Sequence, residues 1–129
     1  MGSKISKNKR VKVWWKYGGK CAYCGIDVEF GKMHVDHIIP KQRGFTQHEA
    51  IKYGITKGGD NLDNLNPSCA SCNISKSTFS IDKWRIELAL KVDRLRRDVT
   101  NFRILERFGV VKETKEPIVF YFEKGGKNG

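Results

Sequence analysis

All four cysteines of the chain fall in two Cys-x-x-Cys pairs, Cys21/Cys24 and Cys69/Cys72. Two pairs of this spacing are typical of a tetrahedral four-thiolate zinc site. Such a site would bring two distant segments, residues 34–40 and 73–77, onto one small platform. We therefore expect all four sulfurs to hold a structural Zn²⁺. The alternative is two disulfides in an exported protein, but the lysines at the N-terminus are not followed by the apolar block of a secretory signal.

Three further residues, Asp36, His37 and Asn73, have the side chains that phosphodiester hydrolysis needs. The reaction requires a base for water on one side of phosphorus and neutralisation of the developing negative oxygen on the other. An imidazole suits the first task near neutral pH, which points to His37. A hard divalent cation suits the second, and the oxygens of Asp36 and Asn73 are ligands that it prefers. Two protein ligands leave positions open for water and phosphate.

A strand and a helix start must position these groups. Residues 35–39 are expected to form a strand ended by Pro40, and a short helix is expected from Cys72. Adjacent strand residues point to opposite faces, so Asp36 and His37 can flank one phosphate only where the strand is distorted. Residues 41–59 are a long connection in which residues 45–53 are expected to form one or two helical turns.

Basic residues are concentrated at the two ends of the chain. The formal net charge is +11, of which residues 1–20 carry +7, residues 21–79 carry none and residues 80–129 carry +4. Clustered lysine and arginine favour a polyanion through counterion release, whereas a solvated surface is the alternative for the N-terminal tail and for the arginines near residue 100. Our candidates for DNA contact are Lys9, Arg10, Lys12, Lys16, Arg43, Arg94 and Arg97.

The expected architecture is α+β, with three segments in one domain. Residues 1–20 form a basic N-terminal arm, of which residues 1–10 read as a polar tail. Residues 21–79 form the core with both cysteine pairs. Residues 80–129 form an extension that packs on the core, with one long amphipathic helix and a short closing strand at residues 118–122. The helix has a buried apolar stripe of Ile81, Trp84, Leu88, Val92, Leu95, Val99 and Phe102.

Four blocks in order resemble the HNH endonucleases. They read Cys-x-x-Cys-Gly, His-Val-Asp-His-Ile-Ile-Pro, Gly-Gly-Asp-Asn-Leu-Asp-Asn-Leu and Cys-x-x-Cys-Asn-Ile-Ser-Lys-Ser. The second and fourth blocks are also similar to the HNH domain of the RNA-guided CRISPR nucleases. The resemblance implies a ββα-metal (His-Me finger) core stapled by the zinc site.

By the same resemblance, His37 is the general base and Asp36 and Asn73 are metal ligands. Asn64 is the asparagine that holds the histidine loop through backbone hydrogen bonds, and Lys76 faces phosphate. His34 could support the metal ligands from behind, act as a third ligand, contact DNA or have no catalytic role. His48 is expected at the surface. Many relatives have a histidine where this chain has Asn73. An oxygen-rich site favours Mg²⁺ or Mn²⁺ over zinc or nickel.

The predicted function is metal-dependent hydrolysis of double-stranded DNA, with one strand nicked per active site. The segment after Ser80 also resembles small stand-alone HNH proteins of phages and prophages. We expect an intracellular, cytoplasmic protein, because no stretch approaches the ~18 apolar residues of a membrane span. We expect it to be a monomer or a homodimer. One alternative is a zinc-ribbon DNA-binding protein without catalysis. Another is a nuclease for RNA or single strands, whose bases could stack on Trp14, Trp15 and Tyr17.

Overall fold

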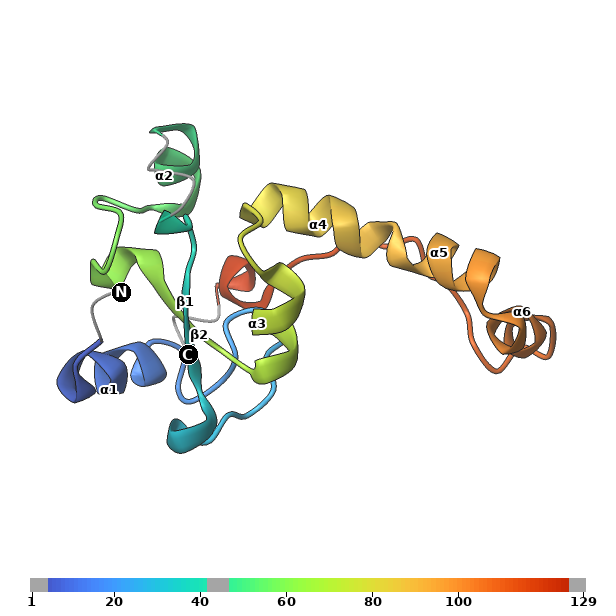
Figure 1. Cartoon of the computed structure of the whole chain (residues 1–129), viewed down its shortest axis with the longest axis horizontal. Coiled ribbons are helices and arrows are strands. Elements are labelled where there is room, and N and C mark those ends of the chain that lie inside the picture. The colour runs from blue at the N-terminus through green and yellow to red at the C-terminus, as the bar shows by residue number, and fades with distance from the viewer. Residues whose placement is uncertain (1–4, 42–46, 126–129) are drawn as a thin grey trace. The chain divides into compact units, whose positions relative to one another are not determined.

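Two short antiparallel strands pair with one another in the computed structural model, which describes residues 5–41 and 47–125 (Figure 1). Strand β1 (His34–His37) pairs with β2 (Leu65–Ser68) so that His34 is opposite Ser68 and Asp36 is opposite Asn66. Every residue of β2 is buried. Helix α3 (Ala70–Lys76) follows β2 directly and contacts β1. The order β1, β2, α3 is the ββα arrangement, so the predicted α+β class is confirmed.

The chain divides into two compact units. The first comprises Met1–Ile81 together with Val119–Gly129, and the second comprises Asp82–Ile118. These bounds differ from the three expected segments, because the basic arm belongs to the same unit as the core. The last residues of the chain also belong to that unit.

Helix α1 (Lys7–Trp15) includes residues 7–10 of the polar tail expected at residues 1–10, of which residues 1–4 lie outside the described part of the chain. Ser6 caps it by accepting a hydrogen bond from the backbone N–H of Lys9, as N-cap serines do. The helix contacts β2, and Val13 is completely buried. Trp14 donates from Nε1 to the carbonyl of Val28 (2.7 Å). The tail prediction was wrong for residues 7–10, because it considered their charge and overlooked the capping serine before them.

The first cysteine pair lies in a turn that two other segments hold. Lys20 and Asp27 form an isolated antiparallel bridge around it, and the 3₁₀ helix η1 (Phe30–Lys32) leads from it to β1. On its other side, the backbone N–H groups of Tyr121 and Phe122 donate to the carbonyls of Tyr23 (3.0 Å) and Ala22 (2.8 Å). Residues 118–122 are therefore not the expected closing strand. They are extended up to Phe120 and then enter the 3₁₀ helix η4 (Tyr121–Lys124).

The connection between the strands contains α2 (Gln47–Tyr53) and the 3₁₀ helix η3 (Leu62–Asn64). Helix α2 agrees with the turns predicted at residues 45–53. Asn61 caps η3 through its side-chain oxygen, which accepts from the N–H of Asp63 (3.1 Å). The apolar core of this unit includes Val13, Met33, Ile38, Ile39, Ile55, Leu65 and Ile81.

Three helices replace the single long helix expected after Ser80. They are α4 (Ile81–Ala89), α5 (Lys91–Asp98) and α6 (Thr100–Arg107). The break before α6 lies at Val99, whose backbone is extended (φ −115°, ψ 106°), and Nη1 of Arg103 donates to the carbonyls of Arg96 (2.8 Å) and Arg97 (3.1 Å). These bonds satisfy carbonyls that the end of a helix leaves unpaired.

The apolar stripe of these helices is not a continuous buried seam. Ile81 and Trp84 are buried, but Leu95 and Val99 are each 42% exposed. The second unit contains several surface ion pairs instead, including Arg96 with Glu106 (2.7 Å) and with Glu113 (2.8 Å). The stripe prediction was wrong beyond Trp84 because periodicity shows which residues share a helix face but not whether anything covers it. None of the described helices combines the length and apolar character needed to cross a membrane.

Candidate active site

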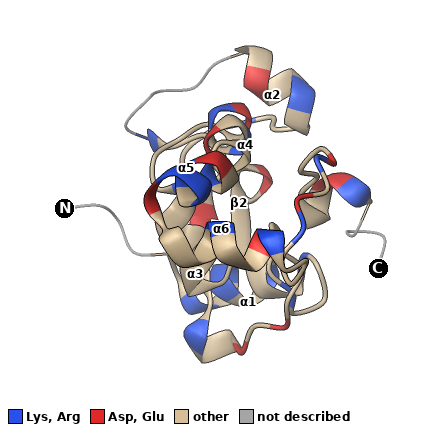
Figure 2. Cartoon of the chain, turned by 90° about the vertical axis from the view of Figure 1, so that its right-hand side faces the viewer, with Lys and Arg blue, Asp and Glu red and all other residues tan. Residues whose placement is uncertain are grey.

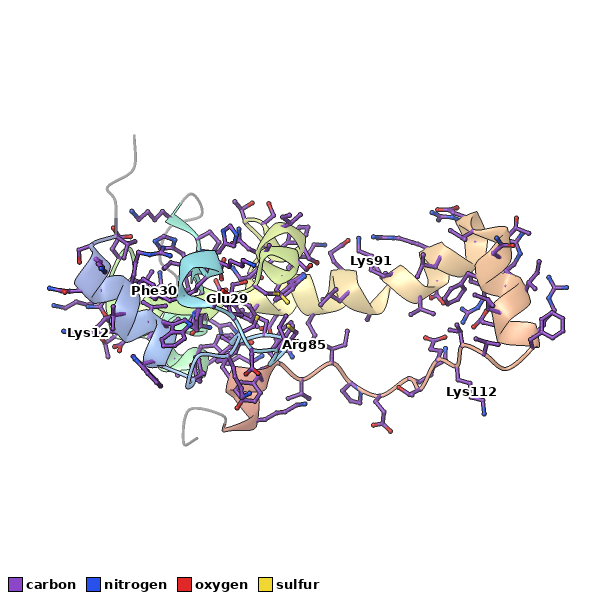
Figure 3. All side chains as sticks on the ribbon, turned by 90° about the horizontal axis from the view of Figure 1, so that it is seen from below. Lys12, Glu29, Phe30, Arg85, Lys91 and Lys112 are labelled. Carbon is purple, nitrogen blue, oxygen red and sulfur yellow. The ribbon has the colours of Figure 1, made fainter. Side chains whose placement is uncertain are left out.

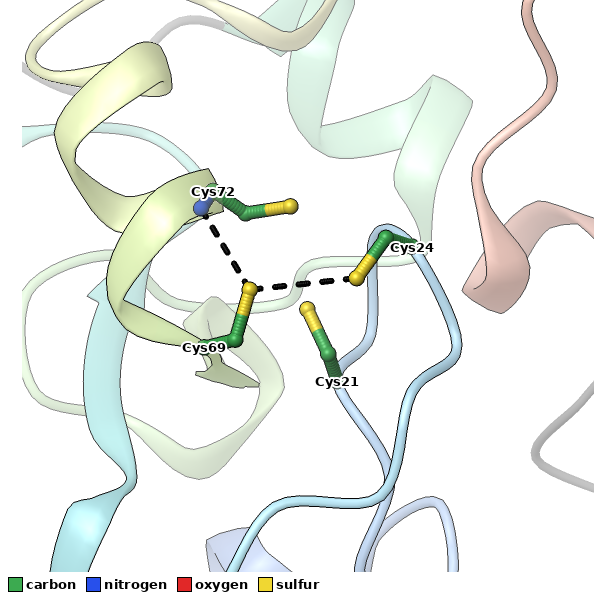
Figure 4. A group of neighbouring side chains, drawn as sticks. All are labelled: Cys21, Cys24, Cys69 and Cys72. Carbon is green, nitrogen blue, oxygen red and sulfur yellow. Dashed lines mark hydrogen bonds between the residues drawn. The ribbon is translucent and has the colours of Figure 1, made fainter.

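The four cysteine sulfurs converge on one point, as predicted (Figure 4). Their Sγ atoms all lie within 4.8 Å of one another, and all four cysteines are free of disulfides. The Sγ atoms of Cys24 and Cys69 are 3.8 Å apart. Four sulfurs at about 2.3 Å from a tetrahedral zinc would be separated by about 3.8 Å, so the cluster has the size of a zinc site.

Each pair is set by local backbone geometry. Gly25 closes the first turn by donating its N–H to the carbonyl of Cys21 (3.0 Å), and its φ of +80° is one that glycine adopts without strain. Cys69 is the N-cap residue of α3, and its sulfur accepts from the N–H of Cys72 (3.4 Å). The second pair is therefore built into the start of the helix that carries Asn73.

The pKa shifts within the cluster differ from one cysteine to another. A hydrogen bond from the Cys72 thiol lowers the pKa of Cys21 to about 4. The same hydrogen bond raises the pKa of Cys72, which donates it. Burial raises the pKa of Cys24. Four thiolates would repel one another, and a bound Zn²⁺ would supply the compensating charge.

Asp36 of β1 belongs to a buried polar cluster with Tyr23, Asn66 and Lys76. Its Oδ2 accepts a short hydrogen bond (2.5 Å) from the hydroxyl of Tyr23, which also accepts from Nδ2 of Asn66 (3.4 Å). Burial raises the pKa of Asp36, whereas the Lys76 ammonium group acts in the opposite direction. Burial also raises the pKa of Tyr23 well above its usual value, so the phenol keeps its proton and donates it.

The structure corrects the expectation that Lys76 faces phosphate. Its side chain is completely buried, and Nζ lies 3.1 Å from Oδ2 of Asp36 and 2.9 Å from the carbonyl oxygen of His37. An unpaired carboxylate at this depth would be costly, so the ammonium group is drawn to it. Lys76 thereby ties α3 to β1 at the two residues of interest. Asn73 lies one turn earlier on the same face of α3 and is partly exposed.

The donors around Asp36 suit a hard cation. The carboxylate already attracts one positive group, the ammonium of Lys76. Asn73, which has an amide oxygen, lies three residues before Lys76 on α3. Across the sheet, Oδ1 of Asn66 is buried and is the one such side-chain atom among the described residues with no hydrogen-bond partner. A set of carboxylate and amide oxygens is what Mg²⁺ or Mn²⁺ prefers.

His37 has a different neighbourhood from Asp36, as expected for adjacent strand residues. Its Nε2 lies 2.8 Å from Oδ1 of Asp60, and the ring is 26% exposed. Asn64 is completely buried, and its Oδ1 accepts from the N–H of Ile39 (2.9 Å) while its Nδ2 donates to the carbonyls of Ile39 (3.1 Å) and Gly59 (3.0 Å). These are the kind of backbone bonds expected for Asn64.

The other two histidines are exposed. His34 begins β1 opposite Ser68, and His48 lies on α2 at the surface, as expected. Neither belongs to a metal-binding cluster within residues 5–41 and 47–125.

Most of the candidate DNA-contacting cations already bond to the protein. Lys9 donates from Nζ to the carbonyl of Asp60 (2.8 Å), and Lys16 donates to the carbonyls of Leu62 (2.9 Å) and Leu65 (2.6 Å). Arg10 donates to the carbonyl of Met33 (3.0 Å) and lies over the ring of Phe30. These three residues fasten α1 to the rest of its unit.

The remaining candidates differ in exposure. Lys12 is exposed on α1 (Figure 3). Arg94 is paired with Glu87 (3.1 Å) and Arg97 with Asp98 (2.7 Å), in helices that carry both acidic and basic side chains (Figure 2). Arg43 lies outside the described residues.

Sequence reasoning overlooked Tyr23 and Asp60. Tyr23 stands between the first two cysteines, where a knuckle residue has no periodicity that predicts burial. Asp60 follows two glycines and precedes Asn61, a context that reads as a turn. The only available signal for Asp60 was a carboxylate close in sequence to Asn64.

Comparisons with known proteins agree with the predicted family. The family model for HNH endonuclease matches residues 21–79. The SPbeta prophage protein YoqL of Bacillus subtilis (strain 168), which is named for the same family, is 33% identical over 84 residues, or 60% of this chain and 34% of YoqL. Among solved structures, the Type II-C Cas9 enzyme from Actinomyces naeslundii is similar over 83% of this chain and 11% of its own length, with 21% identity and a TM-score of 0.49.

Proposed function

Since residues 21–79 are an HNH endonuclease domain, we propose that the chain is a metal-dependent endonuclease that hydrolyses phosphodiester bonds in double-stranded DNA. The observation that carries the proposal is the junction of β1 with α3. There Lys76 contacts both the Asp36 carboxylate and the His37 carbonyl, one turn after Asn73. This contact supports the proposal because it joins the strand that carries Asp36 and His37 to the helix that carries Asn73.

In the proposed reaction His37 is the general base. One ring nitrogen takes a proton from water while the water oxygen bonds to phosphorus, and the bond from phosphorus to the leaving oxygen breaks. The leaving oxygen then takes up a proton from solvent. Asp36 and Asn73 would hold the divalent cation, which when bound supplies electrostatic stabilisation of the negative charge on phosphate.

The structural zinc and the catalytic cation have separate tasks in this proposal. Zn²⁺ on Cys21, Cys24, Cys69 and Cys72 would fix the start of α3 against the first knuckle. Mg²⁺ or Mn²⁺ would serve the oxygen ligands. One site per chain cuts one strand, so a monomer nicks and a double-strand break requires a homodimer or two successive events. The related prophage protein supports action inside a bacterial cell.

A DNA-binding protein without catalysis is the alternative from another class. The high positive charge and the cysteine cluster suit it equally well. It gives no role to the half-buried imidazole of His37 or to the backbone hydrogen bonds that Asn64 makes beside it. A nuclease for RNA or unpaired strands is a weaker alternative, because Tyr17 is buried and only Trp15 of the three aromatic candidates is largely exposed, at 62%.

The test is cleavage of supercoiled plasmid with Mg²⁺ or Mn²⁺, compared with single- and double-stranded RNA and single-stranded DNA. We expect nicked circles from plasmid, loss of cleavage on chelation, and loss of cleavage in His37→Ala with DNA binding retained. The exposed His48→Ala is the matched control and should cut normally. Wild-type rates from His37→Ala, or binding by the wild type without any cleavage, would refute the proposal.

A further inference from the structure

Asp60 lies against the proposed base and has no role so far. Its Oδ1 is 2.8 Å from Nε2 of His37 and 3.0 Å from Nζ of Lys41. The carboxylate is only 23% exposed. It comes from a different part of the chain, the turn before η3, so the contact does not follow from the position of His37 in β1.

Several interactions fix this turn beside β1. Asn64 bridges the carbonyls of Gly59 and Ile39, which joins the residue before Asp60 to the segment just after His37. The carbonyl of Asp60 itself accepts from Nζ of Lys9 (2.8 Å). Gly59 has a φ of +59°, a conformation that residues with a side chain rarely adopt. Asp60 is thus held in place by its neighbours on both sides.

The contact has a direction. An ionised carboxylate is only an acceptor, and here one oxygen faces both the imidazole and an ammonium group. The proton of the neutral ring therefore lies on Nε2, and the lone pair lies on Nδ1. Among the residues that the structure describes, Asp60 at Nε2 is the hydrogen-bond partner of the ring, and the side chain is 26% exposed.

We propose that Asp60 is the positioning residue of His37, holding the ring with Nε2–H toward the carboxylate and Nδ1 toward the attacking water. The inference rests on the proposed function, because it names the nitrogen that takes the proton. When Nδ1 takes that proton, the ring becomes positive and the carboxylate of Asp60 stabilises it in place. Asn64 acts one step further back, since it holds the two backbone segments together.

Three variants of the full-length zinc-bound protein test this. Asp60→Ala removes the acceptor, and Asp60→Asn keeps an acceptor oxygen of nearly the same shape without the charge. Asp63→Ala is the matched control, because this carboxylate lies three residues later, accepts from Thr56 and has no described contact with His37. Two quantities are measured: plasmid nicking, as kcat and KM, and the NMR signal of the Nε2 proton of His37, assigned by its absence in His37→Ala.

We expect Asp60→Ala to lower kcat on the order of 10²-fold with little change in KM, as loss of a positioned base does. Asp60→Asn should retain more activity, and Asp63→Ala should match the wild type. The Nε2 proton should exchange slowly with water in the wild type and in Asp63→Ala, and its signal should vanish in Asp60→Ala.

Normal nicking by Asp60→Ala would overturn the inference while leaving His37 as the base. An equal loss in Asp63→Ala would also overturn it, because the effect would then be structural. A wild-type protein that does not cleave would refute the proposed function instead. The proton signal would still report whether Asp60 holds His37, so the two failures are distinguishable. Rapid exchange of the Nε2 proton in the wild type would overturn the inference in either case.

Discussion

The two units of the chain are stabilised in opposite ways. The first unit buries polar groups and satisfies most of them: Asn64 and Lys76 are completely buried, and both bond to neighbouring segments. The second unit leaves apolar residues such as Phe108 (78%) and Val110 (70%) exposed and has its ion pairs at the surface. The second unit is also the more highly charged, with 17 Asp, Glu, Lys or Arg among its 37 residues against 22 among the 92 residues of the first.

The contrast shows where geometry has to be accurate. Buried hydrogen bonds fix side chains within narrow limits, and several of them lie around Asp36 and His37. Surface ion pairs contribute little individually and tolerate change. We therefore expect the catalytic site in the first unit. Substitutions in the buried polar cluster of the first unit should have larger effects than substitutions in the surface ion pairs of the second.

Loss of zinc should unfold the first unit. Small zinc modules gain about 10–16 kcal/mol from the metal, which is comparable with the whole ~5–15 kcal/mol stability of a domain. We expect Cys69→Ser to lose stoichiometric zinc and the hydrogen-exchange protection of β1 and β2, while α5 and α6 lose much less. Ser71→Ala, an exposed residue between the second pair of cysteines, is the control. Full protection of β1 without zinc would contradict the staple.

Lys76→Met should destabilise the first unit by about 3–5 kcal/mol, because it leaves the Asp36 carboxylate buried without its partner. Methionine keeps the apolar stem, so the loss reports the charge. Urea unfolding at saturating zinc measures it. Lys83→Met removes an exposed partner of Glu87 in the second unit and should have almost no effect. Equal losses for both variants would remove the distinction between the two units.

Tyr23→Phe should lower cleavage more than stability. It removes the hydroxyl that donates to Asp36, at a cost of about 1–3 kcal/mol, and leaves a proposed metal ligand free to turn. Nicking rates at several Mn²⁺ concentrations, with zinc content as a check, measure the effect. Tyr121→Phe is the control, since the ring of Tyr121 packs on Tyr17 and Gly25 without a described hydrogen bond from its hydroxyl. Unchanged nicking in Tyr23→Phe would show that Asp36 needs no such support.

The smallest effect is expected in acid, in the second unit. The hydrogen bond from Arg96 lowers the pKa of Glu106 below its ordinary value. A carboxylate whose pKa is lower in the folded state than in the unfolded state stabilises the fold at pH values above its unfolded pKa of ~4.3. This stabilisation is lost as the pH falls through the pKa of the folded state. Hydrogen-exchange protection in α5 and α6 should therefore decrease slightly below about pH 4.3. Arg96→Gln should remove this dependence, and an unchanged dependence would exclude the pair as its cause.

Much of the first unit was predictable because the spacing of its cysteines, and the order of the motifs between them, can be read directly from the sequence. The two cysteine pairs require one another, and the ββα order follows once they are joined. Asn64 was placed by the motif, and the structure shows the buried amide bonds that such a residue makes. Lys76 was misplaced because sequence shows a charge but not its burial. Asp60 was missed because its contact with His37 depends on how a glycine turn folds back on β1.

The second unit was predicted less well. Its apolar period gave the correct helical content but not the break at Val99, which depends on tertiary bonds from Arg103 to the preceding helix. The burial of the stripe was also overestimated, since a repeating pattern carries no information about a covering partner. Roles in DNA contact for Lys9 and Lys16 remain predictions, although both now have structural tasks.

The return of residues 119–125 to the first cysteine turn makes the second unit an insertion in the sequence of the first unit. Removing the chain after residue 118 would strip two backbone hydrogen bonds from the turn that carries Tyr23. Replacing Asp82–Ile118 with a flexible linker would instead leave these bonds in place. The last residues of the described chain therefore support the first cysteine turn through bonds that do not depend on the residues of Asp82–Ile118.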